Sequence, residues 1–128
     1  HKKHGADLTH YLGLPLGSGV EIISGSALTS AHSKANKPYQ LEHVTPYIYE
    51  NKDQFNVLEL QASGIHDRPE IRITVDEEKD FEVAEKIVQH LYVKGNNFPL
   101  SKIIEVWDGE NLKTINRDVR QIKVNLKQ

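Results

Sequence analysis

Two carboxylates stand where a folded chain could use them for chemistry. Asp76 directly follows the alternating segment 71–75, which predicts a strand, and directly precedes a segment with helical periodicity. In open α/β sheets ligands collect at the carboxyl ends of strands, and an oxygen ligand there is placed to hold Mg²⁺. The same position also suits a helix cap. Glu21, on a short apolar segment after the loop 16–19, is either a second functional carboxylate or a solvent-facing strand residue.

Two further side chains are of types that bind substrates. His43 stands near a predicted helix start, where it could donate to a substrate or satisfy a neighbouring carbonyl. Arg72 lies on the predicted strand 71–75. Its guanidinium suits carboxylate or phosphate, or it points to solvent from a half-buried strand. None of the seven histidines forms a metal-ligand spacing, and the loop 16–19 lacks the spacing of a phosphate-binding loop.

The elements that must position these residues follow from hydrophobic periodicity and from Gly, Pro and capping residues. The predicted strands are residues 20–23, 56–62 and 71–75, with a short edge strand at 124–126. The predicted helices are residues 27–35, 41–51, 76–92 and 101–109. Ser24 or Ser26 can cap the first helix, Pro46 is tolerated in the first turn of the second with Thr45 as the cap before it, and Ser101 caps the last. This mixed order argues for an α/β fold class.

The composition is that of one globular domain. Of 128 residues, 38% are hydrophobic and 27% charged, and this length supports one modest core, so we expect a single domain over residues 1–128. No apolar run approaches the roughly 20 residues of a membrane span, and the net charge of −2 argues against nucleic acid as a partner. The absence of cysteine excludes disulfides and zinc–thiolate sites and fits a cytoplasmic location.

The chain contains no methionine and begins with His1. A natural reading frame starts with Met, and removal of the initiator normally leaves a small residue. We therefore expect the sequence to be a piece of a longer protein.

Three segments carry information beyond composition. They are LEHVTPYIYEN at 41–51, RITVD at 72–76 together with DFE at 80–82, and the segment 98–107. In this order and spacing they resemble the C-terminal half of the spore-coat polysaccharide cytidylyltransferases (SpsF-like), a branch of the wider family that includes the CMP-sialate and CMP-KDO synthetases. Residues 116–120 resemble the family's closing segment, so the likeness runs from about residue 5 to about residue 121.

This resemblance implies a fold and a reaction. The fold is the nucleotide-diphospho-sugar transferase α/β/α sandwich, of which the chain carries the C-terminal half. The reaction transfers CMP from CTP to a sugar hydroxyl and releases pyrophosphate, with Mg²⁺ as cofactor and CTP and a sugar as partners of the complete protein. Asp76 matches the family's VD motif and would be a metal ligand. Glu21 corresponds to an acidic residue near the sugar site, and we assign Arg72 and His43 to substrate binding.

Two departures from the family pattern leave alternatives open. The N-terminal half with its phosphate-gripping loop is absent from these residues, so we expect the isolated chain to be inactive. Gly19 stands where the family pattern has Asp. One alternative is a non-catalytic module for dimerisation or partner binding, with Tyr47, Tyr49 and Phe55 as an exposed apolar surface; a homodimer is expected in either case. A glycosyltransferase is weaker, because no DxD motif is present.

Overall fold

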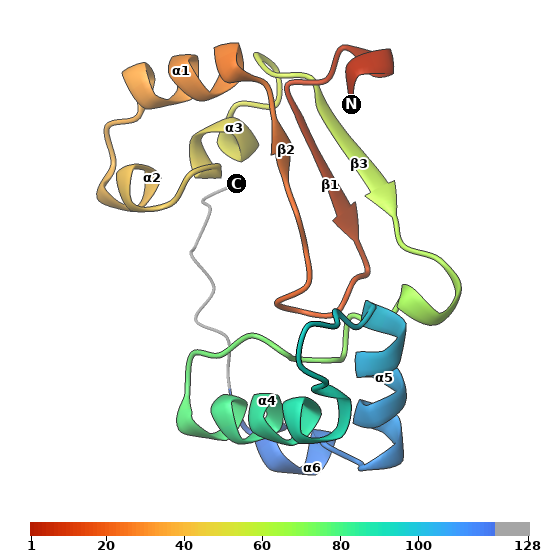
Figure 1. Ribbon diagram of the computed structural model, residues 1–128. Helices are drawn as coiled ribbons and strands as arrows, with labels where there is room; N and C mark the ends of the chain where they lie inside the picture. The colour runs from red at the N-terminus through yellow and green to blue at the C-terminus, as the bar shows by residue number, and fades with distance from the viewer. Residues whose placement is uncertain (120–128) are drawn as a thin grey trace. The chain divides into compact units, whose positions relative to one another are not determined.

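The computed structural model describes residues 1–119, which have a mixed α/β architecture of a small sheet and several helices (Figure 1). The chain divides into two compact units, each described here by itself. Unit 1 comprises residues 1–11 and 20–60, and unit 2 comprises residues 12–19 and 61–119. The expected α/β class is confirmed. The single domain over residues 1–128 stays a prediction, and the predicted strand 124–126 lies outside the described residues.

In the described residues the sheet has three strands in the order β2-β1-β3. They are β1 (Leu8–Leu12), β2 (Ile22–Ile23) and β3 (Val57–Gln61); the last residue of β1 and of β3 belongs to unit 2. β2 is antiparallel to β1, with Leu8 opposite Ile23 and Thr9 opposite Ile22, whereas β3 runs in the same direction as β1 (Figure 1). Both β2 and β3 were predicted. β1 was not, because its sequence LTHYL has no continuous alternation.

The described part of unit 1 also contains three short helices. They are α1 (Gly25–Lys34), α2 (Pro38–Glu42) and α3 (Pro46–Glu50), after an N-terminal 3₁₀ turn at Lys2–His4. Ser24 caps α1 as predicted, its Oγ accepting from the Ala27 amide at 3.2 Å. The predicted helix 41–51 is wrong as one element. Because proline is tolerated only in a first turn, Pro38 and Pro46 each begin a separate helix.

The core of unit 1 lies between the sheet and these helices. Its buried members are Leu8, Ala27, Ala31, Ile48 and Phe55, and Tyr47 and Tyr49 pack against them. The rings of Tyr47 and Phe55 meet edge to face with centroids 6.1 Å apart. The expectation that Tyr47, Tyr49 and Phe55 form an exposed contact surface is therefore wrong. These aromatic residues cluster in the sequence because they pack the core.

Unit 2 is mainly helical. Its helices are α4 (Glu78–Leu91), α5 (Leu100–Gly109) and α6 (Lys113–Asn116), with a 3₁₀ turn at Gly64–His66. α4 matches the predicted helix within two residues at its start. α5 begins one residue earlier than predicted, after Pro99 rather than a Ser101 cap. Its buried core is Ile71, Val83, Ile87, Ile104, Trp107 and Leu112.

The predicted strand 71–75 is wrong as a full strand. Among residues 1–119, Arg72 is the one residue of this segment that pairs, in an isolated parallel bridge with Leu16 that is closed by two backbone hydrogen bonds of 2.8 Å. The partner segment leaves the pairing direction at Gly17, where φ is +101° and the backbone passes close to Thr74. The alternation of residues 71–75 therefore reflects burial of Ile71 and Ile73 against the helical core rather than a ladder.

Candidate functional site

A buried ion pair lies at the start of α4 in unit 2. Arg72 donates from Nε to Oδ1 of Asp80 at 2.8 Å and from Nη2 to Oδ2 at 2.7 Å. Asp80 is 1% exposed and Arg72 is 9% exposed. The hydrogen bonds from Arg72 hold the pKa of Asp80 well below its usual range, although burial opposes them. Arg72 therefore does not face solvent. That alternative is wrong, and its assignment to substrate stays a prediction.

Asp76 lies beside this pair and is the exposed member of the group. Nη2 of Arg72 donates to its Oδ2 at 2.9 Å, while the Asp76 side chain remains 60% exposed. Within residues 1–119 no hydrogen bond or ion pair engages its Oδ1. The N-cap of α4 is Glu77, so the alternative in which Asp76 caps the helix is wrong. Its carboxylate is thus held through one oxygen and presents the other.

The donor chemistry around Asp76 suits a shared cation site rather than a closed one. Mg²⁺ is commonly bound through one or two carboxylates, with substrate phosphates and water filling the remaining positions. One guanidinium and the two carboxylates of Asp76 and Asp80 sum to a net charge of −1, so the group still attracts a cation. In residues 1–119 no cluster of three or more His, Asp or Glu could hold a metal ion by itself. Asp76 would therefore supply one coordinating group to the cation, and a bound substrate would have to supply others.

Glu21 belongs to a cluster of titratable side chains in unit 1. It directly precedes β2, and its Oε1 accepts from the Tyr49 hydroxyl at 2.5 Å. The His10 ring meets the Tyr49 ring edge to face, with centroids 5.2 Å apart, and its Nε2 lies 3.3 Å from Oε1 of Glu59. Lys52 donates to the same Glu59 oxygen at 2.9 Å. The cluster therefore contains both hydrogen-bond donors and carboxylate acceptors.

The environment of this cluster shifts two of its groups. Burial, followed by the hydrogen bond to Glu21, raises the pKa of Tyr49 above its ordinary value. The hydrogen bond from Lys52 is the main cause that lowers the pKa of Glu59. Tyr49 thus remains a hydrogen-bond donor at neutral pH, and Glu59 remains a carboxylate.

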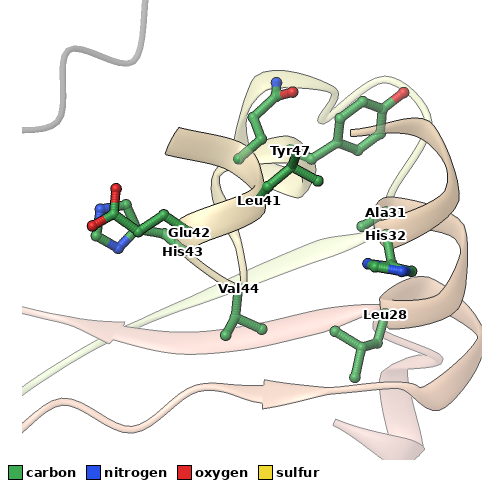
Figure 2. A pocket seen from close by; sticks show the side chains of 9 residues that line it. Leu28, Ala31, His32, Leu41, Glu42, His43, Val44 and Tyr47 are labelled. Carbon is green, nitrogen blue, oxygen red and sulfur yellow. The ribbon is translucent and has the colours of Figure 1, made fainter. Parts of the chain in front are cut away.

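His43 follows α2 and lines a pocket of about 180 Å³ in unit 1 (Figure 2). The lining comes from α1, with Leu28, Ala31 and His32, and from residues 40–44 and Tyr47. In Figure 2, His32 projects from α1, whereas His43 and Glu42 come from the end of α2. This volume is below the roughly 300–1,000 Å³ of ordinary ligand pockets, so the pocket can take only a small group or part of a larger ligand.

The four residues singled out by sequence fall into two sets. Arg72 and Asp76 are brought into direct contact in unit 2. Glu21 and His43 both lie in unit 1, where Glu21 contacts Tyr49 and His43 lines the pocket. The main omission is Asp80, which appears in the sequence analysis only within the segment DFE at 80–82. No sequence signal pairs it with Arg72 eight positions earlier, because the contact depends on the turn between them.

The chain is similar to two curated proteins. It is 36% identical to the uncharacterized protein MJ1063 of Methanocaldococcus jannaschii over 93% of this chain and 49% of that protein. It is 30% identical to the spore coat polysaccharide biosynthesis protein SpsF of Bacillus subtilis over 70% of this chain and 38% of that protein. The chain thus spans about half the length, or less, of the curated relatives it matches. No protein-family model matches the chain.

The fold is similar to that of a solved cytidylyltransferase from Leptospira borgpetersenii serovar Hardjo-bovis. The TM-score is 0.73 and the sequences are 25% identical, over 92% of this chain and 48% of the solved chain. Together these matches support a cytidylyltransferase-like relationship for the chain. Separately, within residues 1–119, no helix is both long enough and apolar enough to cross a membrane.

Proposed function

We propose that the chain is the C-terminal part of a sugar-activating cytidylyltransferase, which transfers CMP from CTP to a sugar hydroxyl and releases pyrophosphate. The observation that carries the proposal is the exposed Asp76 carboxylate, held through one oxygen by the buried Arg72. The similarity to SpsF and to a solved cytidylyltransferase supports the same conclusion. Surface or spore-coat polysaccharide biosynthesis is the pathway we propose, with a homodimer in the cytoplasm as the working form.

Asp76 is the residue we assign to Mg²⁺. When bound, Mg²⁺ neutralises phosphate charge, and transfer at phosphorus depends largely on such neutralisation and on positioning. Asp76 would hold the cation through its free oxygen, and Arg72 would keep the carboxylate in one orientation. The sequence places no Lys or Arg between Arg72 and Asp76, so no other basic side chain of this segment competes for the carboxylate.

Glu21 and His43 are the residues we assign to the sugar. Glu21 can accept hydrogen bonds from hydroxyl groups with the carboxylate oxygen that Tyr49 does not use. The His43 imidazole can donate from the pocket wall to an anionic or carbonyl group. Both assignments are independent of that of Asp76.

The test uses the full-length protein with CTP, Mg²⁺ and a panel of sugars, with pyrophosphate release as the readout. Asp76→Asn should reduce release at least a hundredfold. Asp108→Asn is the matched control, because Asp108 is also an exposed carboxylate, 53% against 60% for Asp76, held by an arginine of the same unit. Full activity of Asp76→Asn would refute the metal assignment. If the wild type releases no pyrophosphate from CTP with any sugar of the panel, the non-catalytic module is favoured instead.

A further inference from the structure

Asn116 of α6 begins a chain of contacts that ends at Asp76. Its Nδ2 donates to Oδ1 of Asp80 at 2.9 Å and to the backbone carbonyl of Arg72 at 3.1 Å. All three residues are buried, at 3%, 1% and 9% exposure. One amide therefore ties together the side chain of Asp80 and the backbone that carries Arg72, from a helix 36 residues further along the chain.

Asp80 supports Asp76 in two ways, through the backbone of Asp76 and through its side chain. Its Oδ2 accepts from the backbone amides of Asp76 and Glu77, both at 3.2 Å, and this fixes the main chain that carries the exposed carboxylate. The same oxygen accepts from Nη2 of Arg72, and that Nη2 also donates to Oδ2 of Asp76. Backbone and side chain of Asp76 thus depend on one buried carboxylate.

This arrangement is poorly explained by stability alone. A buried ion pair loses in desolvation much of what it gains in attraction, and well-packed apolar residues of similar size often do as well or better. Here Nη1 of Arg72 is also buried with no hydrogen-bond partner among the described residues, which adds a further cost. Besides bonding to each other, Arg72 and Asp80 each make a bond to Asp76, Arg72 to its carboxylate and Asp80 to its backbone amide, so the network also orients that residue.

We propose that Asp80 and Arg72 are positioning residues for Asp76, with Asn116 locking Asp80 in place. Asp80 fixes the Asp76 backbone and the Arg72 guanidinium, and Arg72 occupies one oxygen of Asp76 so that the other is presented to a divalent cation. The inference rests on the proposed function, because that function assigns the cation to Asp76. It reassigns Arg72 from substrate contact to orientation of a ligand.

The test measures Mn²⁺ affinity in the presence of CTP, by calorimetry on the full-length protein. Arg72→Lys keeps the charge but loses the forked geometry, and should weaken Mn²⁺ binding about tenfold, as removal of a partner that orients a metal ligand typically does. Arg68→Lys is the matched control, since Arg68 holds Asp108 by two hydrogen bonds in the same unit and should leave affinity unchanged. In an Asp76→Asn background, Arg72→Lys should cause no further loss.

A milder variant and a metal-free readout keep the inference testable if Arg72→Lys does not fold. Asn116→Ala removes the hydrogen bonds to Asp80 and to the Arg72 carbonyl and should speed amide hydrogen exchange at residues 76 and 77 while the exchange of α5 is unchanged. Weakened Mn²⁺ binding by Asp76→Asn, with wild-type affinity in Arg72→Lys and Asn116→Ala, would overturn this inference alone. Unchanged Mn²⁺ binding in Asp76→Asn would overturn the proposed function, and this inference with it.

Discussion

The side-chain amide of Asn116 reaches the carboxylate of Asp80 at 2.9 Å, joining α6 to the first turn of α4 in the interior of unit 2. Asp80 is the most heavily hydrogen-bonded carboxylate in this unit. It accepts from Arg72, from Asn116 and from the backbone amides of residues 76 and 77. The local fold of unit 2 and the orientation of Asp76 therefore both depend on the Asp80 carboxylate, and a substitution of Asp80 should affect both.

Asp80→Asn should destabilise unit 2 by about 3–5 kcal/mol at pH 7, because it leaves the buried Arg72 guanidinium without its main counter-charge. Urea unfolding followed by Trp107 fluorescence is a suitable measurement. Trp107 is the single tryptophan and lies in the core of unit 2. The exposed pair offers the control: Asp108→Asn, beside Arg68, should cost less than about 1 kcal/mol.

The same variant predicts a pH dependence. The pKa of Asp80 is depressed in the folded state, so its stabilising effect is complete above the unfolded value of about 3.9 and is lost as pH falls towards the folded value. Between these two pKa values the Asp80 carboxyl takes up a proton in the unfolded chain but stays ionised in the folded chain. The stability gap between wild type and Asp80→Asn should therefore narrow between pH 5 and pH 2.5. A constant gap would contradict the depressed pKa.

Gly17 and Gly19 offer a matched pair in the loop 16–19. At Gly17 φ is +101°, and a Cβ would lie 2.5 Å from the Thr74 backbone nitrogen, whereas nothing lies within 4 Å of a Cβ at Gly19. Gly17→Ala should destabilise by at least about 2 kcal/mol, since both the backbone angle and the contact are unfavourable. Gly19→Ala should change stability by less than about 0.5 kcal/mol. Equal unfolding midpoints in urea would refute the close approach.

Helices α1, α4 and α5 and strand β3 were predictable because their signals are local. The apolar face of α4, the cap at Ser24 and the prolines that start helices are all read from neighbouring residues. The division between α2 and α3 at residues 43–45 was missed, since the end of α2 and the start of α3 both fall inside the segment 41–51 that was predicted as one helix. The strand prediction for residues 71–75 was wrong because strand pairing is not a local property. Alternation predicts which side chains are buried but not whether a neighbouring strand pairs with them.

The exposed residues of the candidate site could be predicted from the sequence, but the buried residues that hold them in place could not. Asp76 could be placed from its position between the alternating segment and a helix. Arg72 holds its side chain and Asp80 holds its backbone amide, and Asp80 is in turn bonded by Asn116 from α6, so these contacts depend on how α4 and α6 pack. Arg72 was assigned to a substrate because guanidinium chemistry suits one. The structure shows that Arg72 is buried and that two of its nitrogens already donate to carboxylates of the same unit, and the sequence reveals neither fact.

Ser24→Ala tests the N-terminus of α1. Ser24 Oγ accepts from the Ala27 amide at 3.2 Å, and loss of such a cap typically costs about 1 kcal/mol. Ser33→Ala lies near the other end of the same helix, where its hydroxyl donates to the Ser30 carbonyl, and should be nearly neutral. Far-ultraviolet circular dichroism during urea unfolding distinguishes the two. Equal stability of both variants would argue against the capping role.

The contact between Tyr49 and Glu21 predicts a tyrosine that ionises late. Burial is the larger cause of its raised pKa and the hydrogen bond to Glu21 is the second. Glu21→Gln should therefore lower the pKa of Tyr49 but leave it above the ordinary value of about 10. A carbon-13 titration of the tyrosine Cζ atoms, with Tyr49→Phe to assign the signal, measures this directly. A titration unchanged in Glu21→Gln would show that the Glu21 contact does not act on the phenol.

The raised pKa also fixes the direction in which stability changes at high pH. Above about pH 10 the unfolded chain releases the Tyr49 proton while the folded chain retains it, so the stability of unit 1 should fall as pH rises. Tyr49→Phe should lose about 1 kcal/mol at pH 7, from the missing hydrogen bond, and show a shallower decline above pH 10. Tyr11→Phe, at a half-exposed tyrosine of β1, controls for the loss of a phenol group. A steeper decline in Tyr49→Phe than in wild type would contradict the assignment, because the group responsible would then lie elsewhere.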